Sequence, residues 1–334
     1  MDAVRWGIIG TAAIALEKVI PSMLSAEGLK VAAIASRDAD KARAAADHFG
    51  IERSYGSYEA ILADPAIEAV YIPLPNHLHV EWAIRAAEAG KHVLCEKPLA
   101  LNVEQLDSLI ACRNRTGRLI QEAVMIRAHP QWEEVCRIVS SGEIGEVHAV
   151  KGVFTEVNLD PMSIVNDAAI GGGALYDLGV YPITAARMVF GAEPERVFAV
   201  SAFDPAFSVD RLTSTILMFS GGRHATLMVS TQLALRHHVE IFGTLKSLSL
   251  NNPFNPTPHD RCAIVLDDGS TLGGAAAETR MVAPADQYRL QAERFSAAVR
   301  SGASLPIELE WSLGTMKVLD AIRRSVESSA FEPV

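Results

Sequence analysis

The stretch that decides the fold lies at the amino-terminal end and reads Val4-Arg5-Trp6-Gly7-Ile8-Ile9-Gly10-Thr11-Ala12-Ala13-Ile14-Ala15. Val4 to Ile9 is an apolar run of strand length, and an amphipathic stretch follows the turn as far as Ala26. A strand, a tight turn of small residues and a helix, in this order, are typical of the first unit of a dinucleotide-binding domain. In such a unit the pyrophosphate rests against the first amides of the helix.

The turn carries a small residue at each of the three positions of the dinucleotide fingerprint, namely Gly10, Ala12 and Ala15. Two of them are alanine where glycine is usual, and small-residue turns also occur in parallel sheets that bind no ligand. An alanine adds one methyl group and still leaves the first helical amides facing an anion. The residues expected to contact the cofactor here are Gly10, Thr11, Ala12, Ala13 and Ile14.

The end of the second predicted strand, Lys30 to Ala35, indicates which dinucleotide is bound. Ser36 and Arg37 follow it, where an NAD-selective site usually carries an acid that accepts from the ribose hydroxyls. A hydroxyl and a guanidinium suit a 2′-phosphate, so NADP(H) is favoured and NAD(H) is the alternative. Arg37 could instead be a structural surface residue. Asp38 directly precedes the predicted helix Ala39–Phe49 and is expected to be its N-cap.

Strand and helix patterns alternate as far as residue 123. This alternation predicts a doubly wound parallel sheet, the Rossmann architecture, for residues 1–123, with its ligands at the carboxyl ends of the strands. The further segments that carry it are strands at Glu68–Ile72, His92–Glu96 and Leu119–Ala123 and helices at His79–Ala89 and Val103–Arg115.

Residues 124–334 are predicted to form a second domain of different class. After residue 145, β-like segments follow one another with turns between them, which is typical of an open, mostly antiparallel sheet, and helical periodicity returns from about Asp286. The fold class is therefore α/β followed by α+β. The predicted strands are Val147–Thr155, Arg196–Phe203, Leu212–Phe219, His224–Thr231, Val239–Phe242 and Cys262–Leu266.

Polar residues in two loops at strand ends are expected to face the nicotinamide half of the cofactor. These loops are Pro73–His79 and Glu96-Lys97-Pro98. Each residue also has a structural interpretation: a solvated lysine at 97, a helix cap at Asn76, and capping and packing for His77 and His79. No third ligand at suitable spacing accompanies the two histidines, so no metal is expected. The cofactor-contacting residues predicted in these loops are Leu74, Asn76, His79, Glu96 and Lys97.

A triple glycine brings an acid and a phenol into one helical turn. In the run Gly171–Pro182, Asp177 and Tyr181 are four residues apart, so both point from one face of a helix. Such a pair suits the binding and deprotonation of a substrate hydroxyl. The structural alternative is a glycine-rich turn before a helix whose tyrosine lies in the core.

Composition limits the possible partners. The chain has 334 residues, 49% of them hydrophobic, which suffices for two domains with cores, and its net charge of −10 argues against nucleic-acid or anionic membrane surfaces. No apolar stretch approaches the length of a membrane span, and no secretory pattern opens the chain, so a cytoplasmic protein is expected. The four cysteines form no CxxC pair, which indicates neither disulfides nor a zinc site.

Four motifs together resemble one family: the glucose-fructose oxidoreductase, inositol dehydrogenase and rhizopine-catabolism (Gfo/Idh/MocA) oxidoreductases. The motifs are Gly10–Ala15, Tyr71–His79, Cys95–Ala100 and Gly171–Pro182, and their order and spacing match over nearly the whole chain. The resemblance implies a Rossmann domain, a substrate domain with an open sheet, and a homodimer or homotetramer. It also implies that Lys97 is the lysine of the Glu-Lys-Pro motif and that Tyr181 ends the Asp-x-Gly-x-His/Tyr motif as proton donor or acceptor.

Tyrosine at this last position resembles the branch of dihydrodiol dehydrogenase and NADP-dependent xylose dehydrogenase. The implied reaction is reversible hydride transfer between the nicotinamide C4 and a carbinol carbon of a sugar, cyclitol or cyclic diol. A phenol has a reference pKa near 10, so a cation must favour the phenolate of Tyr181, and Lys97 is the candidate. Asp177 would hold a neighbouring hydroxyl or orient Lys97.

One difference from that branch affects the expected substrate. Many relatives carry an arginine shortly before the triple glycine, whereas residues 160–170 contain none. The alternative function is a non-catalytic NADP(H)-binding sensor or regulatory protein, since a fold does not fix a function.

Overall fold

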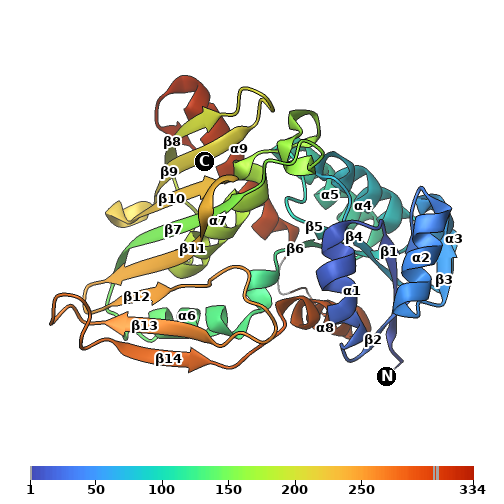
Figure 1. Ribbon diagram of the computed structural model, residues 1–334, viewed down its shortest axis with the longest axis horizontal. Coiled ribbons are helices and arrows are strands. Elements are labelled where there is room, and N and C mark those ends of the chain that lie inside the picture. Colours follow the sequence, from blue (N-terminus) through green and yellow to red (C-terminus); the bar gives the residue numbers. More distant parts are fainter. Residues whose placement is uncertain (1, 304, 306–307) are drawn as a thin grey trace. The chain divides into compact units, whose positions relative to one another are not determined.

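The computed structural model describes residues 2–303, 305 and 308–334 and divides the chain into two units (Figure 1). The first unit runs to Met125 and also includes Asp286–Leu313. The second contains Ile126–Ala285 and Gly314–Val334. Among the described residues, no helix combines the length and the apolar character needed to cross a membrane.

The first unit is built on an all-parallel sheet of six strands in the order β3-β2-β1-β4-β5-β6. This is the Rossmann order, and it confirms the predicted doubly wound sheet. Most strand residues are buried because helices cover a parallel sheet on both faces. The strands are β1 (Val4–Ile9), β2 (Leu29–Ala35), β3 (Arg53–Tyr55), β4 (Ala69–Ile72), β5 (His92–Glu96) and β6 (Ile120–Ala123).

The helices of this unit begin and end at the residue types that the sequence supplies for caps. The side chain of Asp38 accepts hydrogen bonds from the amides of Asp40 and Lys41, which confirms it as the N-cap of α2, and Gly50 ends that helix in the left-handed conformation. The helical segments are η1 (Ala15–Val19), α1 (Ile20–Leu24), α2 (Ala39–Phe49), α3 (Tyr58–Ala63), η2 (Asn76–Leu78), α4 (His79–Glu88), α5 (Val103–Thr116) and α8 (Gln287–Ser301).

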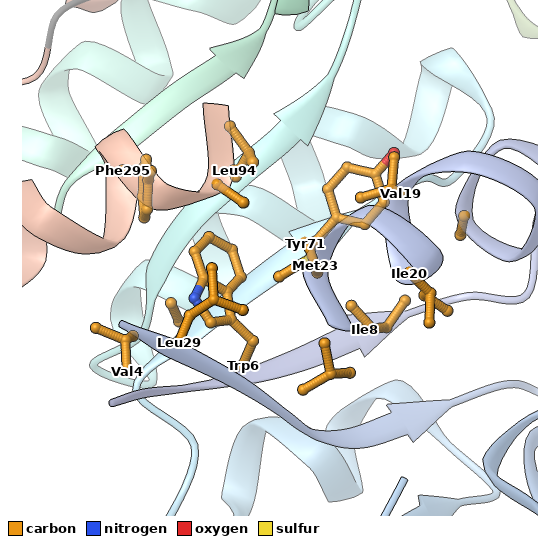
Figure 2. Packing of buried hydrophobic residues seen from close by; sticks show 14 of the residues in the cluster. Val4, Trp6, Ile8, Val19, Ile20, Met23, Leu29, Tyr71, Leu94 and Phe295 are labelled. Carbon is orange, nitrogen blue, oxygen red and sulfur yellow. The ribbon is translucent and has the colours of Figure 1, made fainter. Parts of the chain in front are cut away.

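The position of α8 differs from the domain division expected from the sequence. The indole of Trp6 on β1 packs against Phe295 with ring centroids 5.2 Å apart, and its N–H donates to Ser296 at 3.0 Å. Figure 2 shows Phe295 in the same apolar cluster as Trp6, Tyr71 and Met23. The predicted second domain, 124–334, therefore contains a helix that belongs to the first unit, because α8 buries its apolar face on β1, β2 and α1.

The turn after β1 needs glycine at its first position. Gly10 has a φ of +122°, and a Cβ there would lie 3.1 Å from a methyl carbon of Leu74. The helix that follows opens with a π-type turn, η1, two residues before Pro21. Proline has no amide proton to donate, and the wider turn accommodates the missing bond.

The second unit is built on a nine-stranded sheet in the order β14-β13-β12-β11-β7-β10-β9-β8-β15. Its pairs are antiparallel except for β7 with β10, so the predicted mostly antiparallel sheet is confirmed. The strands are β7 (Val147–Val157), β8 (Arg196–Phe203), β9 (Asp210–Met218), β10 (His224–Ser230), β11 (Gln232–Gly243), β12 (Ser247–Leu250), β13 (Cys262–Asp267), β14 (Glu278–Val282) and β15 (Glu332–Pro333).

One helix of the second unit is buried almost all round. In α7 every residue from Val180 to Phe190 except Met188 is buried, and the helix packs against β7 and β10. It continues a π-type turn, η6, and Pro182 lies three residues beyond the end of that turn. The helical segments of this unit are α6 (Pro130–Ser140), η4 (Ile164–Asn166), η5 (Ala168–Ile170), η6 (Leu175–Gly179), α7 (Val180–Phe190) and η7 (Ser220–Gly222). The division between the two units falls within two further helices, η3 (Met125–Ala128) and α9 (Leu309–Ser328).

Candidate active site

The carboxyl ends of β1, β2 and β4 surround a cavity of about 260 Å³ within the first unit. It lies where the strand order reverses between β1 and β4, which is the usual ligand position in a doubly wound sheet. The cavity contains six of the residues predicted to bind the cofactor. Its lining is Gly10, Thr11, Ala12, Ser36, Arg37, Asp38, Lys41, Tyr58, Pro73, Leu74 and Pro75.

Two cations at this cavity are available to a ligand. Arg37 and Lys41 are both exposed, and within the described ranges neither forms an ion pair with a carboxylate. The neighbouring Arg43, in contrast, is paired with Asp40. Sequence reasoning missed Lys41, although its position four residues after Arg37, in the first turn of the helix that Asp38 caps, could have indicated it.

Ser36 and Tyr58 contribute uncharged polar groups to the cavity wall. The Ser36 hydroxyl accepts from the amide of Asp38 at 3.2 Å, so its remaining lone pair and its proton are available to a ligand. The ring of Tyr58 packs edge-on against Trp82 with centroids 4.9 Å apart, which fixes its orientation. Tyr58 could not be predicted as a site residue, because only the fold brings α3 to the end of β2.

The loop after β5 is anchored through carboxylates. The Tyr71 hydroxyl donates to Glu96 at 2.6 Å, and the amide of Leu99 donates to Glu122 at 2.9 Å. Burial raises the pKa of Glu96, whereas the Tyr71 hydrogen bond and the charge of Lys97 act against that rise. Glu96 therefore lies in the predicted place but is bonded to a core tyrosine, and Lys97, next along the chain, is half-buried.

His79 joins the two loops that follow β4 and β5. Its ring is 1% exposed, with Nδ1 2.8 Å from the carbonyl oxygen of Pro98 and Nε2 2.6 Å from that of Leu74. Burial lowers the pKa of His79 to about 4, against the raising effect of the two carbonyls. A neutral ring has one N–H, so it donates to only one of these two carbonyls, and the other contact is a close approach without a hydrogen bond. His79 still lies in contact with both loops. Asn76, also predicted to contact the cofactor, begins η2 and is half-buried.

Asp177 and Tyr181 lie in the second unit, in η6 and at the start of α7. The amide of Asp177 donates to the carbonyl of Gly173 at 3.1 Å, which fixes its turn of helix. The Tyr181 ring is 5% exposed and lies 5.3 Å from Phe154 and 5.8 Å from Phe254, centroid to centroid. These aromatic neighbours come from β7 and from the segment after β12, and sequence reasoning missed both.

The predicted residues thus fall into three places. Six lie at the first cavity, and Ala13 and Ile14 follow its turn in sequence. Asn76, His79, Glu96 and Lys97 belong to the two loops of the first unit, and Asp177 and Tyr181 belong to one helix of the second. Across residues 2–303, 305 and 308–334, no group of three or more His, Cys, Asp or Glu side chains is arranged to hold a metal ion.

Family comparisons agree with this architecture. Residues 4–124 match the model of the oxidoreductase family with an NAD-binding Rossmann fold, and residues 132–249 match the GFO/IDH/MocA C-terminal domain. The chain belongs to the GFO/IDH/MocA oxidoreductase family. This oxidoreductase is 80% identical to an uncharacterized oxidoreductase of Rhizobium meliloti over 334 residues, all of both chains.

Two characterised relatives cover nearly the same length. A D-xylose 1-dehydrogenase (NADP(+)) of Haloferax volcanii is 36% identical over 97% of this chain and 98% of its own. A 3-ketoreductase from Actinomadura kijaniata, solved with NADP and TDP-benzene, is 34% identical over 97% and 98% of the two chains, with a TM-score of 0.91. Variants of that reductase were also solved, one with tyrosine replaced by phenylalanine and others with lysine replaced by alanine or glutamate.

The cavity residues fit a nicotinamide dinucleotide. Ala15 and Leu16 both donate their amides to the carbonyl of Ala12, so the amides of residues 11–14 precede the first intrahelical bonds and can face a pyrophosphate. The bare Cα of Gly10 allows close approach at the turn. Arg37 and Lys41 add positive charge at the end of β2, where a phosphate on the ribose would lie.

Proposed function

We propose that this oxidoreductase is an NADP(H)-dependent dehydrogenase or reductase that acts on the CH–OH group of a sugar, a cyclitol or a cyclic diol. The observation that carries the proposal is the cavity at the end of β2, where Ser36, Arg37 and Lys41 meet. The acid in its lining, Asp38, accepts from two backbone amides as the N-cap of α2. The relatives named above, one an NADP-dependent xylose dehydrogenase and one a ketoreductase solved with NADP, support the same cofactor and substrate class.

The bound cofactor would supply the hydride donor or acceptor at its nicotinamide C4. The protein then has two tasks, which are to orient the substrate carbinol and to move its hydroxyl proton. We assign the proton transfer to Tyr181, whose hydroxyl belongs to a ring held by Phe154 and Phe254. Lys97, the lysine of the Glu-Lys-Pro motif, is our candidate for the cation that favours the phenolate during this transfer.

Asp177 is assigned a binding role on the same helix. Hydrogen bonds from a substrate hydroxyl to a carboxylate are charge-assisted and directional, so they fix which hydroxyl is presented to Tyr181. The π-type turn of η6 keeps Asp177 and Tyr181 within one turn of each other. A helix is a rigid support for such a pair, because its backbone geometry fixes the spacing of the two side chains.

The direct test follows the absorbance of the reduced nicotinamide while the protein is mixed with NADP or NAD and a panel of aldoses, inositols and trans-diols. We expect turnover with at least one of these and a higher kcat/KM with NADP than with NAD. Tyr181→Phe removes only a hydroxyl, so the melting temperature should stay within a few degrees while kcat falls by about 10²-fold or more. Phe154→Leu, next to the same ring, is the matched control for packing.

Two results would contradict the proposal. If Tyr181→Phe keeps its rate and loses stability, the phenol is a structural hydrogen-bond donor in the aromatic cluster. NADPH binding can be followed as a change in NADPH fluorescence. If the wild-type protein binds NADPH but turns over none of the compounds in either direction, a non-catalytic sensor is favoured over an enzyme.

We also propose that the chain forms a homodimer or homotetramer through the outer face of the nine-stranded sheet. This face carries a shallow hollow of about 360 Å³ whose wall includes Phe198, Val200, Ile216 and Met228, and Val200 is 57% exposed. Contiguous apolar surface of this kind marks association sites. Light scattering after size-exclusion chromatography should give an oligomer, and Val200→Glu should dissociate it. A monomeric wild-type protein would refute this.

We also propose that the protein is located in the cytoplasm. All four cysteines are free thiols, and three of them, Cys95, Cys112 and Cys262, are buried. Free thiols persist in reducing compartments. A fluorescent fusion expressed in the source cells would test the location.

A further inference from the structure

A carboxylate on the sheet of the second unit reaches the start of the helix that carries Asp177 and Tyr181. Asp210, the first residue of β9, accepts a hydrogen bond from the amide of Leu175 at 2.9 Å through Oδ2. Leu175 begins η6, two residues before Asp177 and six before Tyr181. The first amides of a helix have no intrahelical partner, so this bond serves as a cap supplied from 35 residues away.

The same carboxylate explains the third glycine of the triple-glycine run. Gly173 has a φ of +113°, and a Cβ at this position would overlap Oδ1 of Asp210. The backbone therefore approaches the carboxylate more closely than any side chain would allow. Gly173 in turn accepts from the amide of Asp177, so the contact with Asp210 and the placement of Asp177 share one peptide segment.

Asp210 is itself held in place by the sheet. The hydroxyl of Thr213 donates to Oδ2 at 2.7 Å, which leaves the Ser201 hydroxyl, 2.7 Å from Thr213 Oγ1, to act as donor to Thr213. Ser201 and Thr213 are partners across β8 and β9. A chain of three hydrogen bonds thus connects two strands with the helix start. Burial raises the pKa of Asp210 to about 6, although these donors oppose the rise.

From this arrangement we infer that Asp210 is a positioning residue, which sets the register of η6 and so the placement of Asp177 and Tyr181 for the substrate. The inference rests on the proposed function, because it gives Asp177 and Tyr181 their roles. We do not assign Asp210 a contact with the substrate or the cofactor; it acts through the start of η6. Its effect is on kcat through geometry, and a displacement of about 1 Å in such a site can cost up to about 10²-fold.

The test compares Asp210→Ala and Asp210→Asn with a matched carboxylate elsewhere in the same unit. Asp204 also accepts two backbone amides, from Ala206 at 2.7 Å and Phe207 at 3.0 Å, and a side-chain amide from Gln232 at 2.8 Å, but it serves a turn between β8 and β9. Asp204→Ala should therefore reproduce the stability cost without the catalytic cost.

Each variant is assayed at least 15 °C below its own melting temperature, so that folded protein is compared with folded protein. This margin is several times the shift of about 2–4 °C that 1 kcal/mol causes in a domain of about 150–250 residues. We expect Asp210→Ala to lower kcat roughly tenfold or more, with the NADPH dissociation constant within about twofold of wild type. Asp210→Asn keeps the size and one acceptor, so it should recover part of the lost kcat. Asp204→Ala should keep kcat within about twofold.

The outcomes separate this inference from the proposed function. If Tyr181→Phe loses its rate but Asp210→Ala keeps its own, Asp210 is a stabilising cap only and the inference is overturned. If Asp210→Ala and Asp204→Ala lose kcat equally, the loss reflects general loosening, which also overturns it. If Tyr181→Phe keeps its rate, the proposed role of Tyr181 is wrong, and the inference about Asp210, which rests on that role, is overturned with it.

Discussion

Replacing Arg37 and Lys41 should convert an NADP-preferring enzyme into one that no longer distinguishes NADP from NAD. Both side chains are exposed at the cavity and have no carboxylate partner within the described residues, so their charge is available to a phosphate. A charge-assisted hydrogen bond contributes about 1.5–3 kcal/mol, and each 1.4 kcal/mol is about tenfold in affinity. Arg37→Ala should therefore weaken NADPH binding by about 10- to 150-fold.

Lys41 is expected to contribute less. Its ammonium acts as a point charge at an exposed position, where one unit charge at about 4 Å is worth about 1 kcal/mol in water. Against a doubly charged phosphate this gives about 1–2 kcal/mol, or roughly 5- to 30-fold for Lys41→Ala. The double variant should lose less than the product of the two, because both cations act on one phosphate.

Calorimetric titration with NADPH and NADH measures both effects, and NADH binding should change by no more than about twofold. Arg43→Ala is the control, since Arg43 lies on the same helix but is paired with Asp40 and lies outside the cavity lining. Raising the salt concentration should weaken NADPH binding to the wild type more than to the double variant. Equal loss of both cofactors, or a wild type that prefers NADH, would refute the assignment of a 2′-phosphate site.

Three further predictions address the loop lysine, the pH dependence of stability and the core. Lys97→Met should abolish turnover while NADPH still binds measurably by fluorescence, and near-normal turnover would identify Lys97 as a solvated loop residue. Burial lowers the pKa of His92 to about 4, and its Nδ1 accepts from the amide of Leu119, so the neutral form is favoured on folding. This stability is complete above the unfolded pKa of about 6.5 and is lost as the pH falls toward 4. Because solvent screens this part-buried ring, urea unfolding should show a loss of about 1–2 kcal/mol over that range. His92→Asn should flatten the fall, and an unchanged slope would contradict the reasoning. Phe295→Ala should cost about 3–5 kcal/mol in the unfolding of the first unit, and a loss under about 1 kcal/mol would mean that α8 contributes little to its core.

The sequence determined the first unit closely up to residue 123. The apolar runs of β1, β2, β4, β5 and β6 and the amphipathic helices between them were predicted within two residues at each strand end, because each pattern is local and the strands are buried on both faces. The short elements β3 and α3 were missed. A three-residue strand carries too few residues to show a period, and its pairing with β2 provides most of its stability.

Some residues of the candidate site could be predicted from the sequence, and others became apparent only in the folded structure. Gly10, Ser36, Arg37 and Leu74 could be found from the sequence, because a fingerprint turn and strand ends have fixed positions relative to the strands they follow. Lys41 and Tyr58 became visible only when α2 and α3 were placed beside the same cavity. Phe154 and Phe254 likewise reach Tyr181 from segments about 27 and 73 residues away, a separation at which no sequence period operates.

By itself, then, the sequence determined what depends on short range: the strand and helix periods, the turn at Gly10, the cap at Asp38 and the four-residue spacing of Asp177 and Tyr181. Tertiary structure alone decided what depends on packing between distant segments. It assigned α8 to the first unit through the burial of Phe295 against Trp6, and it brought the carboxylate of Asp210 to the amide of Leu175. Burial and hydrogen bonding across such distances are properties of the folded chain, because no local pattern records which surfaces will meet.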